Sequence, residues 1–163
     1  FTTYQLPAGR YVVRGQALPL WTFRGAFLNG RDVSDTPLEL GAEDIGDIVL
    51  RYGDRPAELA GTARGASGPD GAATILVFPA QPGMWSNQGP APRRFKAVRA
   101  GEDGAFRATN LPAGDYVVVG VHGAVPSEWQ DPVFLRKLVA LGTRTTVADG
   151  EIKSLDVSTK EVK

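Results

Sequence analysis

The chain has 163 residues, and its 18 Lys plus Arg balance its 18 Asp plus Glu, so no net charge favours binding to nucleic acid or anionic lipid. It contains no cysteine, which excludes disulfides, thiol nucleophiles and cysteine-ligated metals. The longest apolar run, residues 116–121, is far below the roughly 20 residues that span a bilayer, so the sequence predicts no membrane insertion.

In chain order, the first predicted element is a strand that follows the turn Leu6-Pro7-Ala8-Gly9 and places Tyr11 and Val13 on one side. Residues 21–27 alternate between apolar and other residues, which predicts a strand with Trp21 in a core. Residues 38–50 have the pattern of a strand, an acidic turn and a second strand. The first third of the chain is therefore predicted to be β-structure.

Short strand patterns continue beyond residue 55, separated by Gly, Pro and Asp clusters that favour turns. They cover residues 58–63, 73–78, 95–98, 116–121 and 152–157. One helix interrupts them, with Asp131 as its cap, Pro132 at its first position and Gly142 as its stop. Its apolar stripe consists of Phe134, Leu135, Leu138 and Leu141.

An internal repeat organises these elements. Residues 1–15 align without gaps on residues 106–120, with nine of the fifteen positions identical, including Leu-Pro-Ala-Gly-x-Tyr-Val-Val. About 50 residues of the second copy precede this motif, and none of the first copy do. We therefore predict a C-terminal half of a β-sandwich domain at 1–54 and a complete one at 55–163. The predicted fold class is all-β, with tandem immunoglobulin- or transthyretin-like sandwiches, the first incomplete and the second carrying one short helix.

Two motifs of the second copy carry a family resemblance. Asp103-Gly104-x-Phe106 and Leu111-Pro112-x-Gly114-x-Tyr116 resemble the carboxypeptidase regulatory-like domains, which are small transthyretin-like sandwiches. Residues 28–35 and 128–135 also resemble the C-terminal ends of large envelope proteins of soil bacteria. The resemblance implies a fold and an extracytoplasmic location, in the cell envelope or secreted. It does not imply a reaction, because fold alone does not confer activity.

Few residues suggest catalysis. His122 is the single histidine and follows a strand, so we interpret it as a surface residue at a strand end. Gly65-x-x-Gly68-x-x-Gly71 resembles a phosphate loop but lies between two strands, which favours a hairpin turn. We therefore predict no enzyme activity, no catalytic residue, no cofactor and no metal site.

Residues 79–92 form a long, Pro-rich loop, and such loops are where small sandwiches often bind partners. Its candidate contact residues for a partner or glycan are Met84, Trp85, Arg93 and Arg94, although for Trp85 the favoured interpretation is that it closes the sandwich end against Trp129 and the helix. Phe1 and Tyr11 are further candidates, because an incomplete sandwich presents an uncovered apolar face that recruits a strand, either from the upstream part of a longer polypeptide or from a neighbouring subunit.

These patterns lead to three functional hypotheses. The first is a non-enzymatic structural or interaction module of an extracytoplasmic or cell-envelope bacterial protein. It binds a protein partner or a neighbouring subunit through the incomplete sandwich edge, in an arrangement that permits filaments. The second is a carbohydrate-binding module that uses Trp85. The third is a hydrolase with a carboxylate site that no motif marks.

Overall fold

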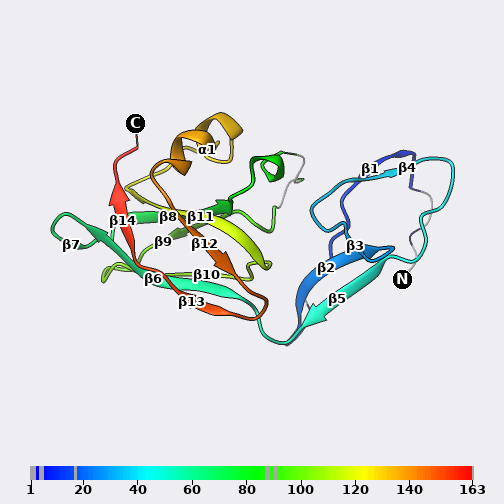
Figure 1. Ribbon diagram of the computed structural model, residues 1–163, viewed down its shortest axis with the longest axis horizontal. Coiled ribbons are helices and arrows are strands. Elements are labelled where there is room, and N and C mark those ends of the chain that lie inside the picture. The colour runs from blue at the N-terminus through cyan, green and yellow to red at the C-terminus, as the bar shows by residue number, and fades with distance from the viewer. Residues whose placement is uncertain (1–2, 4–5, 17, 87–88, 90–91, 163) are drawn as a thin grey trace. The chain divides into compact units, whose positions relative to one another are not determined.

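The computed structural model describes residues 3, 6–16, 18–86, 89 and 92–162. Among these residues the regular structure is mostly β-strand, with one short α-helix, and the curled sheets belong to the β-sandwich-like class (Figure 1). The chain divides into two compact units: unit 1 comprises 1–54 and 87–91, and unit 2 comprises 55–86 and 92–163. None of the described helices has the length and apolar character needed to cross a membrane.

Unit 1 contains two small antiparallel sheets within its described residues. One sheet pairs β1 with β4, and the other has the order β3-β2-β5. The strands are β1 (Gly9–Tyr11), β2 (Thr22–Leu28), β3 (Arg31–Asp32), β4 (Leu38–Leu40) and β5 (Val49–Gly53).

The β2–β3 hairpin explains part of the motif at residues 28–35. Leu28 pairs with Arg31, which leaves Asn29 and Gly30 as a two-residue loop, and their φ angles are +50° and +78°. Two positive φ values are the requirement of a type I′ turn, for which Asn-Gly is the favoured sequence. The hairpin is therefore encoded locally.

The prediction that Trp21 lies in a core is wrong. Trp21 is 51% exposed, because it ends a turn that begins at Leu18 and lies just before the first residue of β2. Leu20, at the tip of this turn, is 90% exposed and has a φ of +66°. Unit 1 therefore presents apolar side chains to solvent at this turn.

Unit 2 is built from the remaining strands, which form one curled sheet. Its main path has the order β10-β6-β14-β11-β8-β9, with β12 paired to β11 and with β7 and β13 paired to β6. The strands are β6 (Glu58–Gly65), β7 (Gly68–Pro69), β8 (Ala73–Pro79), β9 (Lys96–Arg99), β10 (Ala105–Thr109), β11 (Gly114–His122), β12 (Thr143–Val147), β13 (Ile152–Ser154) and β14 (Val157–Lys160).

Two apolar clusters lie on the opposite faces of β8 and β11, and they explain why these strands are apolar at nearly every position. Ile75, Val77, Tyr116 and Val118 are fully or almost fully buried in the first cluster, against β6 and β10. The second cluster packs the other faces of β8 and β11 against the helix α1 (Pro132–Val139) and the segment that contains Trp85. In Figure 1, α1 lies on the side of β8 and β11 away from β6 and β10.

The helix begins as predicted but ends earlier. Asp131 Oδ1 accepts hydrogen bonds from the amides of Val133 and Phe134 at 2.7 and 3.2 Å, which confirms the cap. The helix ends at Val139 and not at Gly142, so Leu141 lies beyond it and is 41% exposed. A Cβ at Gly142 would lie 2.5 Å from Val117 Cγ1, so glycine is needed there for close packing on β11.

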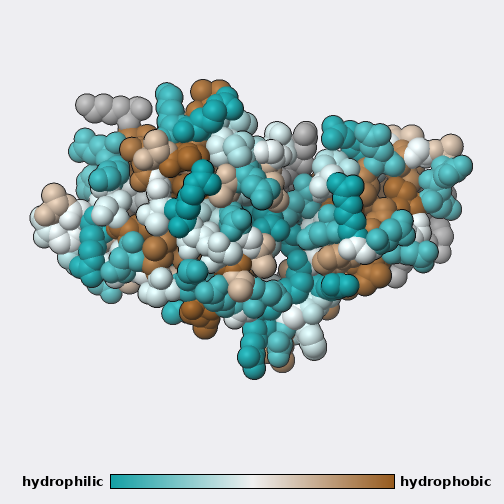
Figure 2. Space-filling view, viewed as in Figure 1, coloured by the Kyte–Doolittle hydropathy of each residue, from teal (hydrophilic) through white to brown (hydrophobic). Residues whose placement is uncertain are grey.

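The surface of the face shown in Figure 2 is mostly hydrophilic. Its hydrophobic residues form small separate patches, one of which lies over α1. Single exposed apolar side chains are normal on soluble domains and need no function.

Candidate functional site

The repeat motif forms the same antiparallel strand pair in both units. In unit 1, Gly9 pairs with Leu40 and Tyr11 with Leu38. In unit 2, Gly114 pairs with Val147 and Tyr116 with Thr145. The β1–β4 pair of unit 1 therefore reproduces the β11–β12 pair of unit 2, residue by residue.

A tyrosine hydroxyl closes the turn in each copy. Tyr11 Oη donates to the Pro7 carbonyl at 2.7 Å, and Tyr116 Oη donates to the Pro112 carbonyl at 2.6 Å. This local bond, of the kind called a tyrosine corner in immunoglobulin-type sandwiches, ties the start of the strand to the preceding turn. It explains why Pro and Tyr occur four residues apart in both copies.

The two copies differ in what lies beside this strand pair. In unit 2 the other edge of β11 carries β8, in an antiparallel pairing from Tyr116 opposite Pro79 to His122 opposite Ala73. In unit 1, β1 pairs with β4 alone, as far as the described residues show. Tyr116 is fully buried, whereas its counterpart Tyr11 is only partly buried. The candidate site is this edge of β1.

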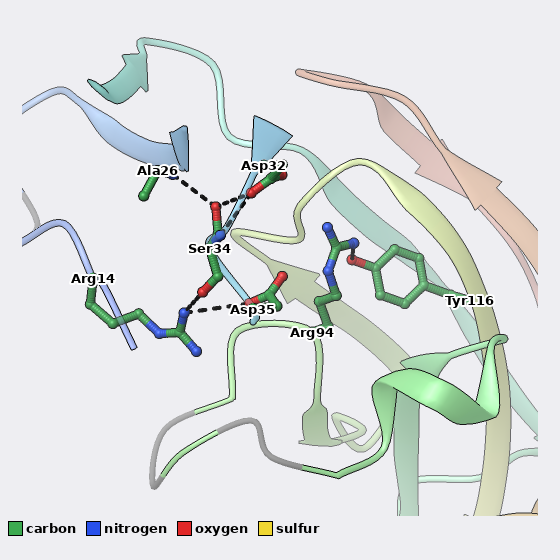
Figure 3. A network of polar contacts seen from close by, with 7 residues as sticks. All are labelled: Arg14, Ala26, Asp32, Ser34, Asp35, Arg94 and Tyr116. Atoms are coloured by element: carbon green, nitrogen blue, oxygen red, sulfur yellow. Dashed lines mark hydrogen bonds and ion pairs between the residues drawn. The ribbon is translucent and has the colours of Figure 1, made fainter. Parts of the chain in front are cut away.

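A polar network holds the chain that follows β1 (Figure 3). Arg14 donates to the Ser34 carbonyl and lies 3.5 Å from Asp35 Oδ1. The buried Ser34 hydroxyl accepts from the Ala26 amide at 2.8 Å and donates to Asp32. This network fixes the end of the β1 segment against the β2–β3 hairpin, and the sequence analysis did not identify it.

The structure places the predicted contact residue Trp85 inside unit 2. Trp85 is 5% exposed, its ring packs against Phe78 with centroids 6.0 Å apart, and its Nε1 donates to the Pro79 carbonyl at 2.7 Å. A buried ring offers no face for a sugar, so the platform hypothesis for Trp85 is set aside. Met84 is half-buried and ends the short 3-10 helix η1 (Pro82–Met84).

The two candidate arginines, Arg93 and Arg94, follow Trp85 in the sequence and come just before β9. Arg94 Nη1 donates to the Ala113 carbonyl at 2.9 Å and lies 3.2 Å from Tyr116 Oη, so it completes the tyrosine corner of unit 2 (Figure 3). Arg93 is half-buried, and its charge, after the larger effect of burial, helps lower the pKa of Lys96. Phe1 lies outside the described residues.

His122 is exposed at the end of β11, as predicted, but it has a partner that the sequence analysis missed. Its Nδ1 lies 2.8 Å from Oδ2 of Asp70, whose side chain is only 8% exposed. The Ala72 amide donates to Asp70 Oδ1 at 3.0 Å. Both groups line an open depression of about 350 Å³ between the β6–β7 hairpin and β14.

The depression has the polar side chains of a site but not the arrangement of a catalytic triad. An Asp–His pair serves catalysis when a nucleophile lies within reach of the second imidazole nitrogen. The hydroxyls that line the depression belong to Ser67 and Thr159, and Thr159 Oγ1 donates to the Arg64 carbonyl at 3.3 Å. We interpret the pair as a polar connection between β11, the β6–β7 hairpin and β14.

The predicted hairpin interpretation of Gly65, Gly68 and Gly71 is confirmed. Gly65 pairs with Gly68 across a two-residue turn. No local sequence signal joins Asp70 to His122, which lies 52 residues later; only the approach of the β6–β7 hairpin to the end of β11 brings them together. Within the described part of the chain, no group of three or more His, Cys, Asp or Glu residues is arranged to hold a metal ion.

The Asp70–His122 pair predicts a pH-dependent stability. The hydrogen bond between them lowers the pKa of Asp70 and raises that of His122. The ordinary pKa values of the two groups in the unfolded chain are about 3.8 for Asp70 and about 6.5 for His122, and the ion pair stabilises the fold fully between these pH values. This stabilisation is lost as the pH rises through the raised pKa of His122. We therefore expect His122→Gln to lower the urea midpoint more at pH 5.5 than at pH 9.

The control is the same substitution in an Asp70→Asn background, which keeps the acceptor for the Ala72 amide but removes the charge. There the effect of His122→Gln should not depend on pH. An equal loss at both pH values in the native background would show that the ion pair does not form.

No protein-family model matches the sequence, and no curated protein matches it. Solved structures that match part of the chain include the TIE protein of Bacillus anthracis, at 16% identity and a TM-score of 0.39 over 76% of this chain and 20% of that one. A DUF3823 family protein from Bacteroides ovatus is 19% identical, with a TM-score of 0.36 over 63% and 42% of the two chains.

The minor pilin GBS52 of Streptococcus agalactiae is 14% identical, with a TM-score of 0.38 over 78% of this chain and 59% of the pilin. The chain thus spans less than two thirds of each of these proteins. All three TM-scores lie below 0.5, and we draw the function from the geometry of the chain itself.

Proposed function

We propose that the chain is a non-enzymatic structural or interaction module of an extracytoplasmic or cell-envelope bacterial protein, and that it joins polypeptides through the edge of β1. In this proposal, unit 2 is a complete carboxypeptidase regulatory-like sandwich, and unit 1 is the second half of another one. The duplicated strand pair carries the proposal: β11 has β8 beside it, and β1 has no such neighbour within the described residues.

The backbone of β1 is suited to pairing with a further strand. In unit 2 the Asp115 carbonyl accepts from the Ala80 amide at 2.9 Å, so it points away from β12. Arg10 is the counterpart of Asp115, and Val12 is the counterpart of Val117. Since alternate residues of an antiparallel strand direct their polar groups to opposite sides, the Arg10 carbonyl and the Val12 amide are expected to face the edge. An unpaired edge of this kind is a template for strand addition.

Amide exchange in the full chain tests this proposal. We expect the Val12 amide to exchange on the order of 100-fold faster than the Val117 amide in the monomer, because Val117 pairs with β8, whereas no strand among the described residues pairs with Val12. Sedimentation of the same sample reports whether the chain is a monomer. A stable monomer in which Val12 exchanges as slowly as Val117 would contradict an open edge.

A further inference from the structure

We infer that the side-chain amine of Lys96 is a covalent attachment point of the chain, where an amide bond forms with an acyl group donated by a thioester or a similarly activated carboxyl group. Lys96 is the first residue of β9 and belongs to unit 2. The site is independent of the edge of β1.

The backbone of β9 directs Lys96 toward the apolar interior of unit 2. Lys96 and Val98 are half-buried, whereas Ala97 and Arg99 are exposed. Lys96 pairs with Val77, which is fully buried in the first apolar cluster, and Val98 packs against the same cluster. Opposite residues of an antiparallel pair point to the same face, so the stem of Lys96 lies beside this cluster. Because β9 is the last strand on the main path of the sheet, Lys96 lies at the border of the cluster and stays partly exposed.

The surroundings of Lys96 do not stabilise its charge. Within the described part of the chain, no hydrogen bond or ion pair joins Lys96 to another residue. Lys153, which is also half-buried, donates to the Thr146 carbonyl and lies 3.7 Å from Glu151 Oε1. A charged group that is partly removed from water without a partner costs free energy. The position of Lys96 therefore favours the free amine over the ammonium form.

The charged groups near β9 act in the same direction. Burial lowers the pKa of Lys96, and the positive charge of Arg93 lowers it further. Arg94, the other cation before β9, binds the turn that precedes β11. The paired strand β8 has no ionisable residue, and on β10 the charged residue Arg107 binds Glu58. Desolvation and a neighbouring cation are the two conditions that make a lysine nucleophilic near neutral pH.

The reaction that suits this amine is acyl transfer. The lone pair of the Lys96 nitrogen attacks the carbonyl carbon of the thioester, a C–N bond forms and the C–S bond breaks. The nitrogen loses one proton, and the departing thiolate takes up one proton. The products are an amide and a thiol, and no atom is oxidised or reduced.

Competitive acetylation of the full chain tests the inference. The probe is the small thioester S-acetyl-N-acetylcysteamine in limiting amount, and mass spectrometry of the digested chain gives the rate at each lysine. At about pH 7.5 we expect Lys96 to react about fivefold faster than the exposed Lys137 of α1, because a lower pKa leaves more free amine. In the chain unfolded in guanidinium chloride, the two lysines should react at equal rates.

Two arginine variants separate the effect of charge from that of access. Arg93→Gln should slow acetylation of Lys96 about twofold, and Arg99→Gln, on the exposed face of β9, should leave it unchanged. Acetylation of Lys96 no faster than that of Lys137 in the folded chain would overturn the inference. A preference for Lys96 that persists after unfolding, or an equal effect of the two variants, would also overturn it. The comparison of folded and unfolded native chain decides the matter even where Arg93→Gln fails to fold.

Discussion

Gly61→Ala should lower the stability of unit 2 by about 3 kcal/mol, at the upper end of the range for overpacking. A Cβ at Gly61 would lie 2.1 Å from the carbonyl oxygen of Leu155 and 2.6 Å from its carbonyl carbon. Both are backbone atoms, so neither can rotate away. Relief requires β6 to move from the β13–β14 connection, where the Leu155 amide donates to the Ala60 carbonyl at 2.9 Å.

The matched control is Gly83→Ala, in the short helix η1. A Cβ there would meet no atom within 4 Å, so we expect a change within about 0.5 kcal/mol. Urea unfolding followed by tryptophan fluorescence measures both variants, because Trp85 and Trp129 are buried in unit 2. Equal midpoints for the two variants would show that β6 does not pass so close to Leu155.

Local signals predicted much of the fold. The strands at 58–63, 73–78, 95–98 and 116–121 are present as β6, β8, β9 and β11, within a few residues. Asp131 and Pro132 predicted the helix start because a cap acts within one turn. The Leu-Pro-Ala-Gly-x-Tyr spacing predicted the turn before β11, where Gly114 has a φ of +152°. Each of these features depends on residues close together in the sequence.

Features that depend on distant contacts were not predictable in the same way. Residues 152–157 were expected as one strand, but they belong to two strands, β13 and β14. Both strands pair with β6, and the pairing is interrupted between them, where Gly61 meets Leu155. Trp21 was expected in a core and Trp85 at a loop, yet Trp85 is buried and Trp21 is exposed, because Trp85 lies beneath a layer that α1 completes.

The candidate site contains features of both kinds, those that nearby residues determine and those that depend on distant contacts. The repeat predicted that residues 1–15 and 106–120 share a structure, and the matching register of the β1–β4 and β11–β12 strand pairs agrees with it over residues 9–11 and 114–116. The role of Arg94 could not be read from the sequence, because its bonds to the turn before Tyr116 cross about 20 residues. Arg14 likewise reaches Ser34 and Asp35 through the fold of unit 1.

Residues 55–163 expressed alone should unfold cooperatively, whereas residues 1–54 alone should not. The described residues of unit 1 that are both apolar and buried are Ala26 and Val33, and the buried Ser34 beside them is polar. Unit 2 buries two clusters on either side of β8 and β11. A segment that buries so little apolar surface cannot offset the conformational entropy of ordering its chain.

Thermal unfolding followed by circular dichroism distinguishes the two fragments, and amide dispersion in NMR spectra provides an independent check. We expect a single sharp transition for 55–163, close to that of unit 2 in the full chain, and a shallow, non-cooperative change for 1–54. The sheets that its described residues form have two and three strands and unpaired edges, and such short sheets are marginal by themselves. A sharp transition for 1–54 at a similar temperature would mean that unit 1 is a stable domain, and it would remove the energetic reason for β1 to take up a partner strand.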